Sequence, residues 1–260
     1  MNFQTLETCI NETFKECKGR VSVMLEMDGH VYEFNSDEVY SSASLIKIPI
    51  LIEGFRQVEK GILRLDQQIR VEEYSKAGGA GVIHVLSHGM VLTIKDLMTL
   101  MIIVSDNTAT NILIDLIGKD SINDCIHSLG LSCTKLARLM MDLDAIRQGK
   151  NNLTSAADMV ALLKIINEGS FLSEESRQEI LNMMSHQQFN HKLPAFMDLD
   201  KVFVANKTGE LPAIEHDCAI IGYQGKTVYV AVLIDEIAEK ESARYVLNRI
   251  GKLIYEYIIK

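Results

Sequence analysis

Residues 44–58 read SLIKIPILIEGFRQV, in which a serine and a lysine stand at the head of a long apolar run. The run predicts a buried helix over residues 45–58. Residues three apart share a helix face, so a helix that begins at Ser44 places the Lys47 ammonium beside the Ser44 hydroxyl. The stretch therefore predicts a helical core and a serine nucleophile with a base in reach. Capping the helix is the alternative role for Ser44.

Two further motifs follow in order, Ser-Asp-Asn at residues 105–107 and Lys-Thr-Gly at residues 207–209. Each occurs once, whereas Ser-x-x-Lys recurs at residues 132–135 in a short connector after Gly130. Because short motifs match by chance, their order and context carry the argument. Burial and the nearby Lys207 charge would lower the pKa of Lys47 and make it a base. The three motifs together predict a serine enzyme.

Apolar periodicity outward from this stretch predicts helices in the middle of the chain and strands at both ends. The N-terminal part predicts a helix at residues 2–18 and strands at 21–27 and 30–35, joined by an Asp28-Gly29 turn. Further helices are expected at 94–105, 108–117, 122–129, 156–168 and 174–184. The C-terminal third predicts strands at 202–208, 218–223 and 227–234 and a helix at 238–258.

This order of elements predicts an α+β fold with two lobes. Strands from both ends should share one antiparallel sheet, so residues 1–38 and 185–260 would form a discontinuous α/β lobe. Residues 39–184 would form an inserted all-helical lobe. A catalytic cleft is expected at the junction of the two.

Composition excludes several classes of protein. A chain of 260 residues with 47% hydrophobic content can bury a core, and its net charge of −9 argues against a nucleic-acid partner. No membrane segment is expected. Five cysteines without a Cys-x-x-Cys pair fit reduced thiols. Glutamates at 7, 12 and 16 interrupt any signal peptide, so we expect a cytoplasmic protein, or a secreted or periplasmic one whose leader was removed.

The three motifs resemble those of class A β-lactamases and penicillin-binding proteins. Residues 89–118 and 134–159 resemble the helical domain of class A enzymes in order and spacing. The resemblance implies a five-stranded antiparallel sheet flanked by helices and a small β-lactam, peptide or ester as substrate. It further implies a monomer, with no metal and no other cofactor.

The resemblance also implies a role for each motif residue. Ser44 would attack, Lys47 would act as base, and Ser105 would relay a proton to the leaving group. Lys207 would hold Ser105 and the substrate carboxylate by its charge. The oxyanion would be bound by the backbone N–H groups of Ser44 and Glu210.

The remaining motif residues would bind substrate or support the site. Asn107 would offer its amide to the acyl-amide chain of the substrate, and Thr208 would contact the substrate carboxylate. Gly209 would let the substrate backbone approach closely. Asp106 would tie down the local turn.

One departure from the class A pattern concerns the second half of the reaction. Class A enzymes carry Glu-x-Glu-Leu-Asn on a loop whose first glutamate activates water, and the matching residues 140–144 read MMDLD. Met140 falls at the glutamate position, and a thioether cannot accept a proton from water. Asp142 or Asp144 could replace it if the loop shifts. The far end of the loop, residues 149–152, has no acid to pair with Arg138.

Two histidine assignments also follow from the sequence. By count, His216 takes the place of a class A arginine and could contact a substrate carboxylate when protonated. The alternative is a hydrogen-bonded histidine at the start of a strand. His84 and His88 have the i, i+4 spacing of a zinc helix but lack the glutamate and a third ligand, so no metal site is expected.

The sequence thus predicts a serine acyl-hydrolase that opens β-lactam rings through a Ser44 acyl-enzyme and deacylates slowly. A penicillin-binding-protein-like D-Ala-D-Ala peptidase or esterase is the alternative within enzymes. A β-lactam sensor, which needs acylation but no turnover, is the alternative from another class.

Overall fold

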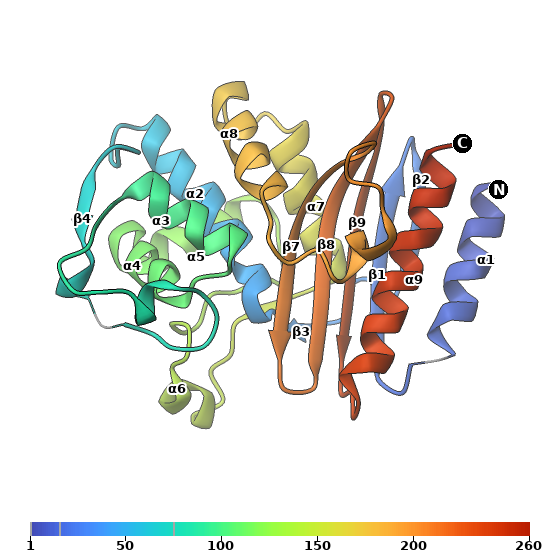
Figure 1. Cartoon of the computed structure of the whole chain (residues 1–260), viewed down its shortest axis with the longest axis horizontal. Coiled ribbons are helices and arrows are strands. Elements are labelled where there is room, and N and C mark those ends of the chain that lie inside the picture. The colour runs from blue at the N-terminus through green and yellow to red at the C-terminus, as the bar shows by residue number, and fades with distance from the viewer. Residues whose placement is uncertain (1, 16, 75) are drawn as a thin grey trace.

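Five antiparallel strands form one sheet in the order β2-β1-β9-β8-β7 (Figure 1). The computed structural model describes residues 2–15, 17–74 and 76–260. The strands are β1 (Arg20–Met27), β2 (His30–Phe34), β7 (Phe203–Leu211), β8 (Ile214–Tyr223) and β9 (Lys226–Asp235). β1 pairs with β9, so the two ends of the chain share the sheet, and the predicted α+β fold with a five-stranded sheet is confirmed.

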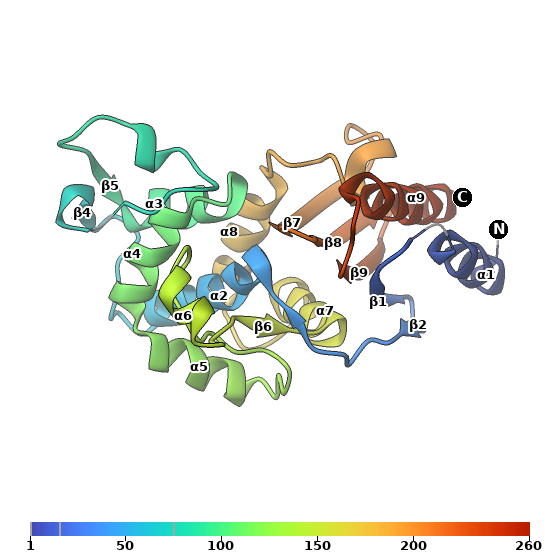
Figure 2. The ribbon, with the colours of Figure 1, turned by 90° about the horizontal axis from the view of Figure 1, so that it is seen from below.

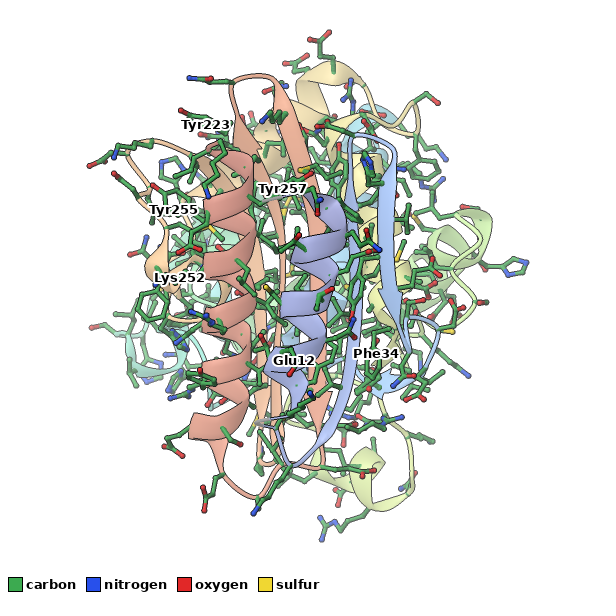
Figure 3. All side chains as sticks on the ribbon, turned by 90° about the vertical axis from the view of Figure 1, so that its right-hand side faces the viewer. Glu12, Phe34, Tyr223, Lys252, Tyr255 and Tyr257 are labelled. Carbon is green, nitrogen blue, oxygen red and sulfur yellow. The ribbon has the colours of Figure 1, made fainter. Side chains whose placement is uncertain are left out.

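Two helices cover the outer face of the sheet (Figure 3). They are α1 (Phe3–Phe14) and α9 (Lys240–Ile258), which lie side by side, and the Tyr257 ring of α9 meets Phe3 of α1 edge-on. Their buried side chains form one apolar core with Val23 and Val230 of the sheet. A Cβ atom at Gly251 would lie 1.9 Å from the Leu193 carbonyl oxygen, so only glycine lets α9 pack this closely on η4 (Leu193–Phe196).

Six longer helices lie on the inner side of the sheet (Figure 1). They are α2 (Lys47–Glu59), α3 (Ile94–Ile103), α4 (Asn107–Ile117), α5 (Lys119–Ser128), α7 (Ala156–Asn167) and α8 (Glu174–Ser185). α7 packs on β1 and β9, and the apolar core here runs from Leu51 of α2 through Met159 to Leu233 of the sheet. This core contains residues from both sides of the proposed lobe boundaries at residues 38 and 184. The division into two lobes therefore stays a prediction.

Several short elements were not predicted from the sequence (Figure 2). Two small sheets join β3 (Tyr40–Ser41) to β6 (Leu153–Thr154) and β4 (Gln68–Arg70) to β5 (Val91–Thr93). A short helix, α6 (Leu143–Arg147), and three 3₁₀ turns, η1 (Ala43–Ile46), η2 (Val71–Glu73) and η3 (Ile83–Val85), complete the described chain. Strands of two or three residues carry too little periodicity to be recognised. Within the described ranges, no helix has both the length and the apolar character needed to span a membrane.

Candidate active site

Ser44 lies in the 3₁₀ turn η1 at the wall of a cavity of about 900 Å³. The turn begins at Ala43, whose φ of 46° is in the left-handed region. Ser44 caps no helix, since the N-cap of α2 is Ile46, and the alternative role is therefore wrong. Its half-buried hydroxyl makes no hydrogen bond to any residue that the structure describes. The hydroxyl is free to turn toward a base or a ligand in the cavity.

Lys47 is fully buried at the first residue of α2, on the same side of the chain as Ser44, because residues three apart eclipse in a 3₁₀ turn. Its Nζ donates to the Ser105 carbonyl oxygen at 2.6 Å, to Ser105 Oγ at 2.9 Å and to Asn107 Oδ1 at 3.0 Å. Burial, followed by the charge of Lys207, holds the pKa of Lys47 well below its ordinary value. A share of neutral amine near neutral pH is what a base at this position requires.

Lys207 approaches Ser105 from the sheet. Its Nζ donates to Ser105 Oγ at 3.1 Å and to the Thr208 carbonyl oxygen at 2.8 Å. Burial lowers the pKa of Lys207 to about 7. Ser105, whose φ is 55°, thus holds its hydroxyl between two lysine amines at the cavity wall. Amine, hydroxyl and amine form a continuous path for a proton.

The Asp106 carboxylate holds the loop that carries Ser105. It caps α4 through Ala109 N–H and accepts from the N–H groups of Val82 and Ile83 at 2.6 and 2.9 Å. The glycine-rich connector at residues 78–81 lies directly on this loop, because a Cβ atom at Gly81 would lie 2.4 Å from Asp106 Cα. The side chain therefore supports the turn and does not line the cavity.

Asn107 lines the cavity, and both ends of its amide already have partners. Oδ1 accepts from Lys47, and Nδ2 donates to the Gly78 carbonyl oxygen at 3.0 Å. One hydrogen of Nδ2 remains for a ligand, since a primary amide carries two.

Strand β7 forms the opposite wall of the cavity and is an edge strand. Thr208 and Glu210 line the cavity, whereas Gly209 does not. A Cβ atom at Gly209 would lie 3.3 Å from each of Ala43, Leu45 and His216. The small size of Gly209 lets the turn of Ser44 lie against β7, and its expected contact with substrate stays a prediction.

Met140 lines the cavity on the third side, with 9% of its surface exposed. Asn111 of α4 fixes its backbone, accepting from Met140 N–H at 2.8 Å and donating to the Met140 carbonyl oxygen at 3.1 Å. Exposed apolar residues continue this wall, namely Met141, Leu143 and Ile146.

The two aspartates near Met140 do not line the cavity. Asp142 caps α6 by accepting from Ala145 N–H at 2.9 Å, and the exposed Asp144 pairs with Arg147. The expectation that either could act as the water-activating base is therefore corrected, because both carboxylates have local partners outside the cavity.

Arg138 is buried, and its partner across the loop is an amide. Its Nη2 donates to Asn151 Oδ1 at 3.0 Å, and Nη1 donates to the Leu139 carbonyl oxygen. Burial lowers the pKa of Arg138 from its ordinary value. The loop is therefore closed by a hydrogen bond to a neutral group where the sequence lacks an acid.

His216 is fully buried in β8 and does not reach the cavity. Its Nε2 lies 2.9 Å from the Ser41 carbonyl oxygen, and its Nδ1 accepts from Ile234 N–H at 3.0 Å. Burial lowers the pKa of His216 to about 4, so the ring is neutral at neutral pH. The expected contact with a substrate carboxylate is corrected, and the alternative of a hydrogen-bonded histidine describes the structure.

Sequence motifs missed several residues at the cavity. Phe189 and His191 precede β7, and Lys240 stands at the start of α9, where it pairs with the Glu210 carboxylate. No motif marks these positions, because only the folding of the C-terminal third brings them to Ser44.

The fold is that of β-lactamase-like serine hydrolases. The chain belongs to the Beta-lactamase enzyme family, whose sequence model matches residues 5–258. It is 25% identical over 238 residues to a β-lactamase of Rhodobacter capsulatus, covering 90% of this chain and 81% of that protein.

Solved structures extend the comparison to nearly the whole chain. A β-lactamase from Sphaerobacter thermophilus is 28% identical, with a TM-score of 0.90 over 99% of this chain and 98% of that one. PBP-A shares the fold at 23% identity, with a TM-score of 0.87 over 98% of this chain and 96% of its own. A leucine-to-glutamate mutant of PBP-A was solved as an acyl-enzyme complex with penicillin G.

Proposed function

We propose that the protein is a serine hydrolase that opens β-lactam rings through an ester on Ser44 and releases the product slowly. One observation carries the proposal: the buried amines of Lys47 and Lys207 both donate to Ser105 Oγ, at the cavity that Ser44 lines. Buried amines with lowered pKa values are costly to a fold and are typical of proton-transfer sites. We propose that the protein acts as a monomer, as the resemblance to class A enzymes implies.

In the proposed reaction the neutral Lys47 amine takes the proton of the Ser44 hydroxyl as Oγ attacks the lactam carbonyl carbon. The backbone N–H groups of Ser44 and Glu210 bind the oxyanion. The C–N bond then breaks, and the leaving nitrogen takes a proton from Ser105. Ser105 regains that proton from the Lys47 ammonium, while Lys207 binds the substrate carboxylate by its charge. The products of this step are an ester on Ser44 and a neutral secondary amine.

Hydrolysis of that ester needs a water molecule and a base. In class A enzymes a glutamate does this work, and here the position holds Met140. General-base assistance contributes about 10²- to 10⁴-fold. We therefore propose that the ester forms and then persists.

Intact-protein mass spectrometry after mixing with penicillin G tests the proposal. We expect an adduct of the mass of penicillin that forms rapidly and decays slowly. Ser44→Ala should form none, and Ser132→Ala, which alters the exposed second Ser-x-x-Lys, should form it as the wild type does. An adduct that survives in Ser44→Ala, or none in the wild type, would sink the assignment.

The same absence of a base favours a second function, a D-Ala-D-Ala peptidase or esterase that β-lactams inhibit. Release of D-alanine from a peptide that ends in D-Ala-D-Ala would identify it, because a β-lactamase should leave that peptide intact. An adduct that never decays, with neither substrate turned over, would favour the sensor function.

A further inference from the structure

Lys192 is fully buried and is not among the residues that line the cavity. Its Nζ donates to the Gly209 carbonyl oxygen at 2.9 Å and to the His216 carbonyl oxygen at 3.2 Å. The Glu215 carboxylate, also fully buried, lies 2.6 Å from the same nitrogen. A buried ammonium is costly to the fold unless it has such partners. The Lys192 ammonium is thus held directly at a backbone carbonyl oxygen of β7.

The carbonyl that Lys192 contacts belongs to the peptide unit between Gly209 and Glu210. Gly209 and His216 are direct partners across β7 and β8. Because one nitrogen reaches the carbonyl oxygens of both residues, these oxygens lie between the two strands. The C=O and N–H of a trans peptide point in opposite directions. The Glu210 N–H therefore points away from β8, toward the free edge of β7 and the cavity.

Several contacts hold Lys192 in this place. The next residue, Leu193, donates its N–H to Asp217 Oδ2 at 3.0 Å, and its carbonyl oxygen lies against Gly251 of α9. Glu215 has a second partner in Arg244, whose Nη2 lies 3.2 Å from Oε1. The ammonium is therefore fixed by the sheet on one side and by α9 on the other.

We propose that Lys192 is a positioning residue that polarises the Gly209–Glu210 peptide and so strengthens the Glu210 N–H as an oxyanion donor. The inference rests on the proposed function, in which that N–H binds the oxyanion. Hydrogen bonds in a chain polarise one another, so a cation at the oxygen of a peptide makes its N–H a better donor. Charge-assisted hydrogen bonds are also shorter and stronger than neutral ones. Lys192 would thus act on the reaction through a peptide bond, without touching the substrate.

The test compares Lys192→Met with Glu215→Gln. In Lys192→Met, Glu215 keeps Arg244 as a partner, and Glu215→Gln leaves the ammonium at Gly209 in place. We expect Lys192→Met to lower the rate of acylation by penicillin G about tenfold, less than the 10²- to 10³-fold that loss of a whole oxyanion donor costs. The penicillin G concentration that gives half the maximal acylation rate should change little, because the donor acts mainly in the transition state. Glu215→Gln should stay near the wild type in both.

Two spectroscopic readouts separate polarisation from a general loss of structure. The infrared band of the ester carbonyl in the Ser44 adduct should move to higher frequency in Lys192→Met, because its hydrogen bond weakens. In the free protein, the Glu210 amide proton and the Gly209 carbonyl carbon should both move upfield in NMR spectra. The double variant Lys192→Met/Glu215→Gln, which also lacks the buried carboxylate, should show the same shifts.

The NMR result does not depend on the substrate. Unchanged Glu210 and Gly209 signals in Lys192→Met would overturn the inference, as would an acylation rate and carbonyl band equal to those of the wild type. If the signals move but the wild type forms no adduct, polarisation by Lys192 stands and the proposed function fails.

Discussion

Met140→Glu should convert slow release of the acyl group into rapid release. Met140 lines the cavity, and Asn111 fixes its backbone by two hydrogen bonds, so a glutamate at this position would start from a defined place. General-base assistance of about 10²- to 10⁴-fold corresponds to about 2.7–5.4 kcal/mol off the barrier to deacylation. The acylation residues are untouched, and acylation should keep its rate.

The cost of the substitution should fall on stability. The site is 9% exposed, and a carboxyl group buried without sufficient partners costs about 1–3 kcal/mol. Arg138 lines the same cavity with only neutral partners for its Nη atoms, and its charge should favour the ionised form of the new carboxylate. We expect a lower urea midpoint together with faster turnover.

A pulse of penicillin G followed by removal of the excess measures the effect, with the decay of the adduct followed by intact mass. Met140→Gln is the matched control, since it has the shape and polarity of glutamate without the basic oxygen. Equal decay in Met140→Glu and Met140→Gln, with acylation intact in both, would refute the reasoning. A wild type that turns over rapidly without a burst would refute it as well.

Three further predictions concern the Arg138 loop, His216 and the apolar wall of the cavity. Asn151→Asp should raise the free energy of unfolding in urea by about 1 kcal/mol, because Arg138 gains a charged acceptor. Asn152→Asp should lower the free energy of unfolding, because the Asn152 amide donates to the Arg138 carbonyl oxygen. A more stable Asn152→Asp variant and a less stable Asn151→Asp variant would contradict this. The pKa of His216, about 4 in the folded protein, lies below its unfolded value near 6.5. The contribution of the neutral ring to the free energy of unfolding should therefore be complete above pH 6.5 and be lost as pH falls toward 4. A His216→Asn variant whose stability has the same slope against pH as the wild type would contradict this prediction. Leu143→Ser should slow acylation by penicillins with apolar side chains, because Leu143 is an exposed apolar residue of the cavity wall. Acylation by penicillins with polar side chains should keep its rate. Equal effects on both groups of penicillins would count against a contact of Leu143 with the penicillin side chain.

The sequence could predict those parts of the site that depend on local spacing. Ser44 and Lys47 are three residues apart, and any helical turn places them on one side of the chain. Long amphipathic segments such as α9 and alternating segments such as β9 also follow from periodicity. The fold and the proposed acylation residues were therefore open to prediction from residues 44–58, two short motifs and the order of elements.

Burial and long-range partners could not be predicted in the same way. Counting along the chain put His216 at the place of an arginine, but β8 is covered on both sides, so the ring had to find its hydrogen bonds inside. Asp142 was expected near the cavity, and capping α6 turned its carboxylate elsewhere. Lys192 precedes a Leu-Pro pair with no motif around it, and only the packing of α9 brings it to Gly209.

The pairing of β1 with β9 has a consequence for how the chain is made. Arg20 and Asp235, which face each other in the sheet, are 215 residues apart in sequence. During synthesis the β1–β2 hairpin leaves the ribosome long before its partner exists, and one edge of β1 stays unpaired meanwhile. Open strand edges and contacts of high sequence separation make folding slow and aggregation easy. Expression yield should therefore depend on temperature and chaperone supply more than the stability of the finished sheet suggests.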